Sequence, residues 1–254
     1  ELLLLFRKLL ATVPEYSATG LKFEKQIDNY PELLKKRELK SEGILVITSN
    51  KGLAGAYNAN IVKKVIKRIA ENGKNGIKTV LYLVGQKAVS SFKNQTGNFE
   101  VRKTYISVIN SPNSIGASII ADDIATDYVD GMVDKISIIT THFNNMMSYN
   151  IVDWNILPIE TKPATAQELD PIMEFEPSAE VILKKLVPMY LTNSVFQALL
   201  EANASELASR MTAMSAASNN AEEVINTLTI DYNKARQAAI TQELVEIVSG
   251  ANAI

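Results

Sequence analysis

The residues most able to do chemistry are scattered along this chain of 254 residues rather than gathered in motifs. The segment from Ser49 to Asn58, SNKGLAGAYN, lies between an apolar run and a helical pattern, where backbone amides could bind a phosphate. It contains neither a GxxxxGK[ST] nor a GxGxxG sequence. A close-packed structural turn is therefore favoured over nucleotide binding.

The other candidate groups also fail to converge. His142 is the only histidine and the chain has no cysteine, so a zinc ligand set cannot be completed and a structural histidine is favoured. Asp122 and Asp123 are adjacent, and on a helix they would point about 100° apart, as expected for a solvated face. No Ser/His/Asp or Cys/His arrangement can be assembled. The sequence thus predicts no catalytic residue, no cofactor and no metal site.

Composition narrows the class of protein. Hydrophobic residues make up 46% and charged residues 21%, which is ordinary for a folded chain of one or two domains. The net charge of −2 gives no basic surface for nucleic acid. No apolar run approaches the roughly 20 residues that span a bilayer, so any membrane contact is expected to be through partners.

The middle of the chain predicts an α/β fold with a Rossmann-like, mainly parallel sheet, because short apolar runs alternate with helical patterns. The expected strands are 44–48, 79–84, 135–143 and an edge strand at 150–159. The expected helices are 58–71, 86–92 and 114–130.

The last third, from about Glu180 to Ile254, predicts one very long helix. No Pro or Gly occurs between Met189 and Ser249, a run that would extend roughly 90 Å as a helix. Its apolar positions alternate in steps of three and four, the spacing of a coiled-coil seam. A helix packed inside a bundle remains the alternative. The principal seam residues are Leu207, Met211, Met214, Ile225 and Leu228.

Three segments of this chain resemble the gamma subunit of F-type ATP synthases. They are ASELASRMTAMSAASNNAEEVINTLTIDYNKARQAAITQELVEIVSGANAI at 204–254, PIMEFEPSAEVILKKLVPMYL at 171–191, and ITSNKGLAGAYNANI at 47–61. The phrasing is closest to the cyanobacterial and chloroplast branch. Two departures are expected. The chain passes from Leu157-Pro158 to the final helix without the regulatory insertion and its cysteine pair, and ELLLLFRKLL resembles only the end of the family's N-terminal helix.

The resemblance implies a long antiparallel coiled coil formed by the terminal helices beside the α/β domain. The expected organisation is residues 1–40 for the end of the N-terminal helix and a connector, 41–160 for an α/β foot, 161–178 for a linker and 179–254 for the coiled-coil helix. Four polar residues match the family's contact with the catalytic ring, the catch: Arg236, Gln237, Thr241 and Glu243.

The function implied by the resemblance is that of a central rotor shaft, itself not an enzyme, which couples ion flow through a membrane ring to ATP synthesis or hydrolysis. The implied partners are the alpha and beta subunits, the epsilon subunit and the membrane c-ring. The implied location is peripheral, on the cytoplasmic face of a bacterial inner membrane, or on a thylakoid or organellar membrane. The alternative is a soluble small-molecule-binding α/β enzyme with a C-terminal dimerisation helix.

Overall fold

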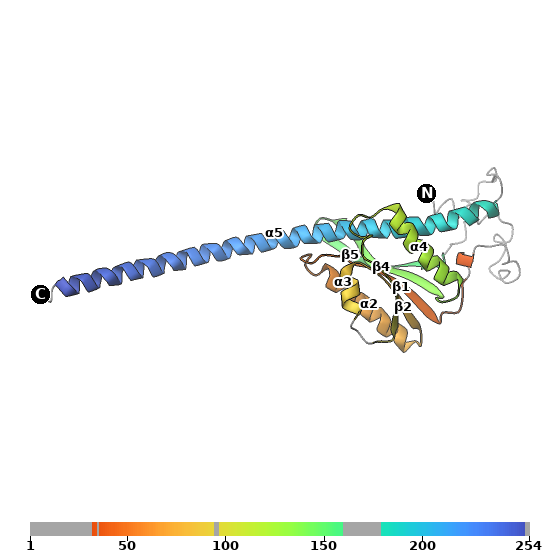
Figure 1. Ribbon diagram of the computed structural model, residues 1–254, viewed down its shortest axis with the longest axis horizontal. Helices are drawn as coiled ribbons and strands as arrows, with labels where there is room; N and C mark the ends of the chain where they lie inside the picture. Colours follow the sequence, from red (N-terminus) through yellow and green to blue (C-terminus); the bar gives the residue numbers. More distant parts are fainter. Residues whose placement is uncertain (1–31, 35, 94–96, 160–178, 252–254) are drawn as a thin grey trace.

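A computed structural model describes residues 32–34, 36–93, 97–159 and 179–251 (Figure 1). A short 3-10 helix, η2 (Glu32–Leu34), precedes five strands that form one sheet. The strands are β1 (Ser41–Ile47), β2 (Lys78–Val84), β3 (Phe99–Tyr105), β4 (Lys135–Asn145) and β5 (Ser148–Leu157).

The sheet has the order β3-β2-β1-β4-β5. β1 pairs in parallel with both β2 and β4, and β2 pairs in parallel with β3. β5 returns from β4 through a hairpin and pairs with it antiparallel. The predicted mainly parallel sheet is confirmed. From β1 the chain adds β2 and β3 on one side and then β4 on the other side, so the strand order reverses between β1 and β4.

β3 was missed by the sequence analysis. Its sequence, FEVRKTY, lacks the apolar run that marks a buried strand, and none of its side chains is fully buried. The strand is held by its ladder to β2 and by charged side chains, as at a sheet edge. Lys78 Nζ lies 2.7 Å from Glu100 Oε2 across this pair of strands.

Helices cover both faces of the sheet, and alternate residues of the strands point to each face. α2 (Tyr57–Lys74) and α3 (Gln86–Phe92) pack on one face, against Ile44, Val46, Leu81 and Leu83. α4 (Ser114–Val129) and the first part of α5 pack on the other, against a second cluster. Its strand residues are Leu45, Ile47, Val80, Tyr82, Val84, Ile136, Ile138, Ile156 and Leu157.

α5 (Ala179–Ala251) is a single helix of 73 residues that begins on the sheet and then projects far beyond it (Figure 1). Leu191, Val195 and Ala202 are among its residues buried in the core. Beyond Ala213, every side chain described as far as Ser249 is exposed. We call β1–β5 with α2–α4 the sheet domain, and residues 214–251 of α5 the free arm.

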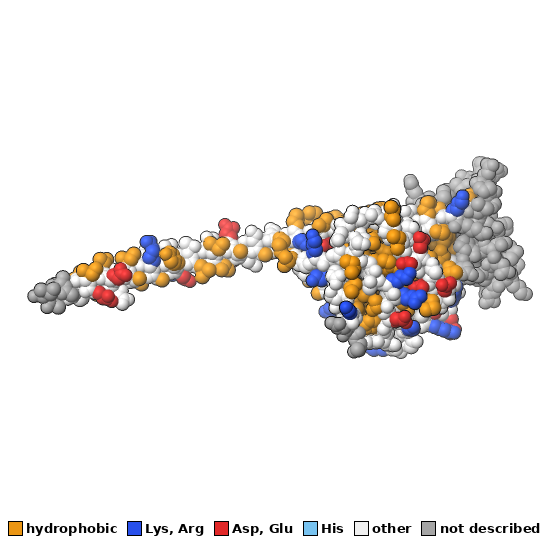
Figure 2. All heavy atoms as spheres, viewed as in Figure 1, with side chains coloured by type: hydrophobic (Ala, Val, Ile, Leu, Met, Phe, Trp, Pro, Cys, Tyr) orange, Lys and Arg blue, Asp and Glu red, His pale blue; other side chains and the backbone are white. Residues whose placement is uncertain are grey.

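The surface of the free arm is rich in large apolar side chains, several of which are visible in Figure 2. Ile225 is 61% exposed and Leu228 is 60% exposed. Soluble chains rarely leave such a surface unpartnered, so it marks a site of interaction. The N-terminal helix expected to pair with it lies in residues 1–31, outside the described residues. The expected linker at 161–178 also lies outside them.

A buried carboxylate stands at the amino ends of the central strands. Glu42, on β1, is fully buried. Arg68 of α2 donates to both of its oxygens, at 3.0 Å from Nε and 2.8 Å from Nη2. Asn72 Nδ2 donates to it at 2.7 Å and Ser137 Oγ at 3.2 Å, while Lys135 Nζ lies 3.4 Å away. Burial raises the pKa of Glu42, but the hydrogen bonds from Arg68 and Asn72 and the charges of Arg68 and Lys135 lower it further, to a net value below normal.

Candidate functional site: the junction between the sheet domain and the long helix

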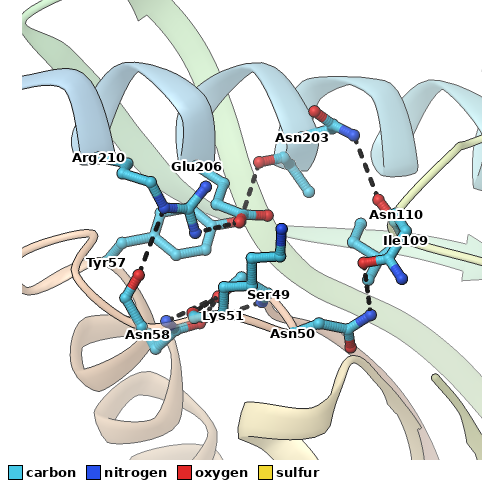
Figure 3. Close-up of polar contacts among 12 residues, drawn as sticks. Ser49, Asn50, Lys51, Tyr57, Asn58, Ile109, Asn110, Asn203, Glu206 and Arg210 are labelled. Atoms are coloured by element: carbon cyan, nitrogen blue, oxygen red, sulfur yellow. Dashed lines mark hydrogen bonds and ion pairs between the residues drawn. The ribbon is translucent and has the colours of Figure 1, made fainter. Parts of the chain in front are cut away.

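In an open parallel sheet, ligands bind at the carboxyl ends of the strands, where the strand order reverses. Here that edge is crossed by α5 (Figure 3). The loops that follow β1 and β3 make hydrogen bonds to α5 residues between Ala202 and Arg210. We call the contacts made by residues 201–212 of α5 the junction. The position that would hold a ligand in a doubly wound fold is therefore occupied by the chain's own helix.

The segment SNKGLAGAYN forms the first half of the junction. Within it, the Ser49 amide donates to Asn58 Oδ1 at 3.0 Å, and Ser49 Oγ donates to the Lys51 carbonyl at 2.7 Å. Tyr57 is buried, and its hydroxyl donates to the Ala202 carbonyl of α5 at 3.0 Å. Burial also raises the pKa of Tyr57, which keeps the phenol a neutral donor. The geometry agrees with the expected structural turn.

Asn50 ties together the three loops at this edge. Its Nδ2 donates to the Ile106 carbonyl and to Asn110 Oδ1, both at 2.7 Å, and its Oδ1 accepts from the Gln86 amide at 2.7 Å. Asn203 of α5 donates to the neighbouring Ile109 carbonyl at 3.2 Å. One amide side chain thus joins the segments after β1, β2 and β3. A second attaches the segment after β3 to the helix (Figure 3).

Arg210 and Thr212 complete the junction at its distal end. Arg210 Nη2 pairs with Glu206 Oε1 at 2.5 Å, one turn earlier on α5, and Arg210 Nε donates to the Gly52 carbonyl at 3.3 Å. Thr212 Oγ1 donates to the Met146 carbonyl, at the tip of the β4–β5 hairpin, at 3.3 Å. Beyond Thr212, the hydrogen bonds of the described part of α5 are made within the helix.

His142 pairs with Glu201 of α5 through Nδ1 and Oε2. Its position on β4, near the hairpin, places this contact on the side of the junction away from the β3 edge. The expectation of a structurally satisfied histidine is met. What the sequence could not show was its partner, 59 residues away.

A shallow cleft of about 280 Å³ remains between the Ala54–Ala56 turn, the hairpin tip and α5. Among the described residues, its lining consists of small, amide, hydroxyl, Tyr and Met side chains without a carboxylate, histidine or lysine. No group of three or more metal-ligating side chains was found in the described parts of the chain. A general acid and base cannot be assembled there.

Asp122 and Asp123 behave differently from one another. Asp122 is exposed, as expected, but Asp123 is only partly exposed, and its oxygens lie 2.5 Å from Lys103 Nζ and 2.7 Å from the donating Tyr105 hydroxyl. The solvated-face interpretation is therefore wrong for Asp123. Because the two partners lie on β3, missing that strand also meant missing this contact.

The predicted catch residues lie on the free arm, and all four are exposed. Thr241 Oγ1 donates to the Gln237 carbonyl at 2.8 Å, within the helix. At about 100° per residue, Arg236 and Glu243 point in nearly the same direction, whereas Gln237 and Thr241 lie about 100–140° around the helix from Arg236. The catch remains a prediction, and its members present two faces rather than one.

We expect Tyr57→Phe to lower the free energy of unfolding by about 1 kcal/mol, because it removes a buried hydrogen bond between the sheet domain and α5 while preserving the ring. Urea unfolding of the full chain measures it. Tyr232→Phe, on the free arm where the ring is 68% exposed, is the matched control and should leave stability unchanged. Equal stability of both variants would show that the Tyr57 bond adds nothing to the junction.

Comparison with known proteins assigns the chain to a family. The family model described as ATP synthase matches residues 6–254. An ATP synthase gamma chain from Picosynechococcus sp. is 42% identical over 248 residues, which cover 87% of this chain and 78% of that protein. The chain belongs to the ATP synthase gamma family. A gamma chain from Prochlorococcus marinus is 38% identical over 97% of this chain and 85% of its own length. The predicted resemblance to the cyanobacterial branch is confirmed.

Solved structures support the same assignment. The central stalk and c-ring structure of the Tetrahymena thermophila mitochondrial ATP synthase contains a chain with a TM-score of 0.57 and 28% identity, covering 72% of this gamma-family chain and 79% of that chain. A chain of the Euglena gracilis mitochondrial ATP synthase matches with a TM-score of 0.63 over 91% of this chain and 81% of its own. At 19% identity, the second likeness shows the fold alone.

Proposed function

We propose that this gamma-family chain is the central shaft of an F-type ATP synthase and that it transmits rotation without catalysing a bond change. The observation that carries the proposal is the free arm, a single helix with an apolar exposed surface that leaves its own domain. Such a helix can reach into a ring of other subunits. Its asymmetric surface would then favour different states of successive catalytic sites, because a contact made with only one state shifts the population toward it.

The junction is the part of the chain suited to transmitting torque. A rotating foot must turn its shaft without slipping, and α5 is attached to the sheet domain both by apolar burial and by hydrogen bonds. These bonds join α5 to the segments after β1 and β3 and to the β4–β5 hairpin. These contacts lie along residues 202–212 of α5, immediately before the free arm. We propose that the sheet domain, residues 41–160, and the helix 179–254 turn as one body.

The proposed partners follow from the family and from the solved assemblies. The matched structures contain a central stalk with a c-ring and an F1 with OSCP and a c-ring. We propose that this chain contacts alpha and beta subunits along the free arm, and the epsilon subunit and a c-ring through the sheet domain, on the cytoplasmic face of a bacterial membrane. Within the described residues, no helix has the length and hydrophobicity needed to cross a bilayer.

The alternative, a small-molecule enzyme with a dimerisation helix, is not favoured. It requires a polar pocket at the carboxyl edge of the sheet, and there the loops are bonded to one another and to α5. The cleft between the hairpin tip and α5 has a neutral lining, and the hollow between α2 and α3 carries Lys63 and Lys87 but no described carboxylate or histidine. The relatives named above are ATP synthase gamma chains.

Co-expression tests the rotor proposal. The chain is produced with the alpha and beta subunits of the same source, the complex is purified through a tag on beta, and ATP hydrolysis is assayed. We expect one copy of this chain per ring, and loss of activity when the chain is omitted. A stable homodimer that does not bind alpha and beta would contradict the proposal and support the enzyme alternative.

The catch assignment gives a second prediction. We expect Arg236→Ala combined with Gln237→Ala to reduce ATP synthesis in membranes about tenfold, because a charge-assisted and a neutral hydrogen bond to the ring would both be lost. The isolated subunit should remain folded, since both side chains are exposed. Gln242→Ala, at a nearby exposed position outside the catch, should have no effect. Unchanged synthesis in the double variant would refute the assignment.

A further inference from the structure

The contact between His142 and Glu201 is the one described junction contact that joins an imidazole to a carboxylate. His142 is the only histidine in the chain, and histidine is the side chain that ordinarily gains or loses a proton between about pH 5 and 8. Its contact with Glu201 is a salt bridge only while the imidazole is protonated. The remaining junction hydrogen bonds join neutral groups or involve Arg210, which stays charged.

We infer that His142 and Glu201 form a pH-responsive clamp, which tightens the attachment of α5 to the sheet domain on protonation and loosens it on deprotonation. The inference concerns the junction itself and stands whether or not the chain acts as a rotor. It goes beyond the family assignment, which concerns what the subunit assembles into and not how firmly its two parts are joined.

Among the described ion pairs, Glu201 is the charged partner of His142. On β4, residues 136–145 carry no other ionisable side chain. Across the ladder on β5, Asn150 stands opposite His142 and is neutral. On α5, residues 191–200 carry no charge, and the next charged groups beyond Glu201 are Glu206 and Arg210, which pair with each other.

Glu201 is positioned for this role. Its side chain is 16% exposed, whereas that of His142 is 48% exposed, so the carboxylate is held near the protein surface and the imidazole can exchange protons with solvent. Gln197, one turn earlier on α5, donates from Nε2 to the other oxygen of Glu201, Oε1, at 2.8 Å. This hydrogen bond helps to hold the carboxylate in place. Deprotonation removes the charge of the imidazole, and a hydrogen bond to Glu201 then survives only in the tautomer with a proton on Nδ1.

The location gives the clamp its effect. Glu201 is followed on α5 by Ala202 and Asn203, which accept from Tyr57 and donate to Ile109. Weakening the contact between His142 and Glu201 therefore acts on the same segment of α5 that bonds to Tyr57 and Ile109. Because the pair is partly exposed, the change in local opening is expected to be about two- to fivefold rather than all-or-none.

Hydrogen exchange of the full chain tests the inference. Amide protection of α5 residues 195–212 is measured at about pH 5.5 and about pH 8 in the wild type, in His142→Lys, which is always charged, and in His142→Gln, which never is. Comparing variants at the same pH removes the intrinsic pH dependence of exchange. The wild type should match His142→Lys at the lower pH and His142→Gln at the higher one, with a two- to fivefold change in relative protection.

A fourth variant keeps the test decisive if His142→Gln does not fold. Glu201→Gln preserves the shape of the partner but removes its charge, so it should abolish the pH-dependent difference while leaving the histidine in place. A wild type that follows the same His142 variant at both pH values would overturn the inference. So would an undiminished pH response in Glu201→Gln.

Discussion

Replacing Ala217 with proline should abolish coupled ATP synthesis by an enzyme that contains this chain. Ala217 is exposed and lies near the start of the free arm. Proline there would remove the backbone hydrogen bond to the Ala213 carbonyl and its ring would collide with that carbonyl, at a cost of about 3 kcal/mol or more. Beyond Ala213 no described side chain is buried against the sheet domain that could restrain the kink. ATP synthesis in membranes measures the effect.

Ala217→Ser is the matched control, because it adds a polar group at the same exposed position without breaking the helix. It should support synthesis close to that of the wild type. The proline variant should also leave the thermal unfolding of the sheet domain unchanged, since residue 217 makes no contact with its core. Normal synthesis with the proline would mean that a continuous helix is not needed, and the rotor mechanism proposed here would fail.

Glu42→Gln is expected to have the largest effect on stability. It keeps the shape of the side chain but removes the buried charge to which Arg68, Asn72, Ser137 and Lys135 are directed. Breaking such a network by removing one partner typically costs about 3–5 kcal/mol. The Arg68 side chain is 26% exposed, so water can solvate part of its charge when the carboxylate is removed. We therefore expect the free energy of unfolding to fall by about 2–4 kcal/mol at pH 7. Urea unfolding measures it.

The difference should depend on pH in a defined direction. The pKa of Glu42 in the folded chain lies below its ordinary value of 4.5, so the folded state binds the proton less readily than the unfolded state. The stabilisation is complete above about pH 4.5 and is lost as the pH falls through the folded pKa. The free energies of unfolding of the wild type and the variant should therefore converge as the pH falls from 4.5 through the lower pKa of the folded state.

Glu100→Gln provides the control for this prediction. Glu100 pairs with Lys78 at 2.7 Å, but both side chains are about half exposed. Exposed pairs of this kind contribute about 0–1 kcal/mol, so its loss should be small at every pH. If Glu42→Gln were as mild as Glu100→Gln, the buried network would not be a major source of stability.

The parts of the fold that sequence analysis predicted are those with a local signal. The β1, β2 and β4 strands are buried on both faces and appear as apolar runs, and α5 is marked by a long interval without Pro or Gly. β3 has no such signal. Its stability comes from its pairing with β2 and from ion pairs to α4, and neither can be recognised from seven residues alone.

The junction could not be predicted for a related reason. Arg210 and Gly52 are 158 residues apart and Asn203 and Ile109 are 94 apart, so no spacing in the sequence relates them. The one usable signal was the SNKGLAG turn after a buried strand, which pointed to the correct edge of the sheet. It could not show that a helix from the end of the chain covers that edge.

The distribution of helix-breaking residues in α5 has a mechanical consequence. Pro188, the helix's only described proline, lies between the buried residues Val187 and Leu191, where the sheet domain supports the backbone. The free arm, roughly 57 Å long for 38 residues at 1.5 Å each, contains neither proline nor glycine before Gly250. The molecule is thus built as a cantilever. The one described proline of the helix lies where the sheet domain holds the helix in place. The free arm, which must carry a load without support, is a regular helix almost to its end.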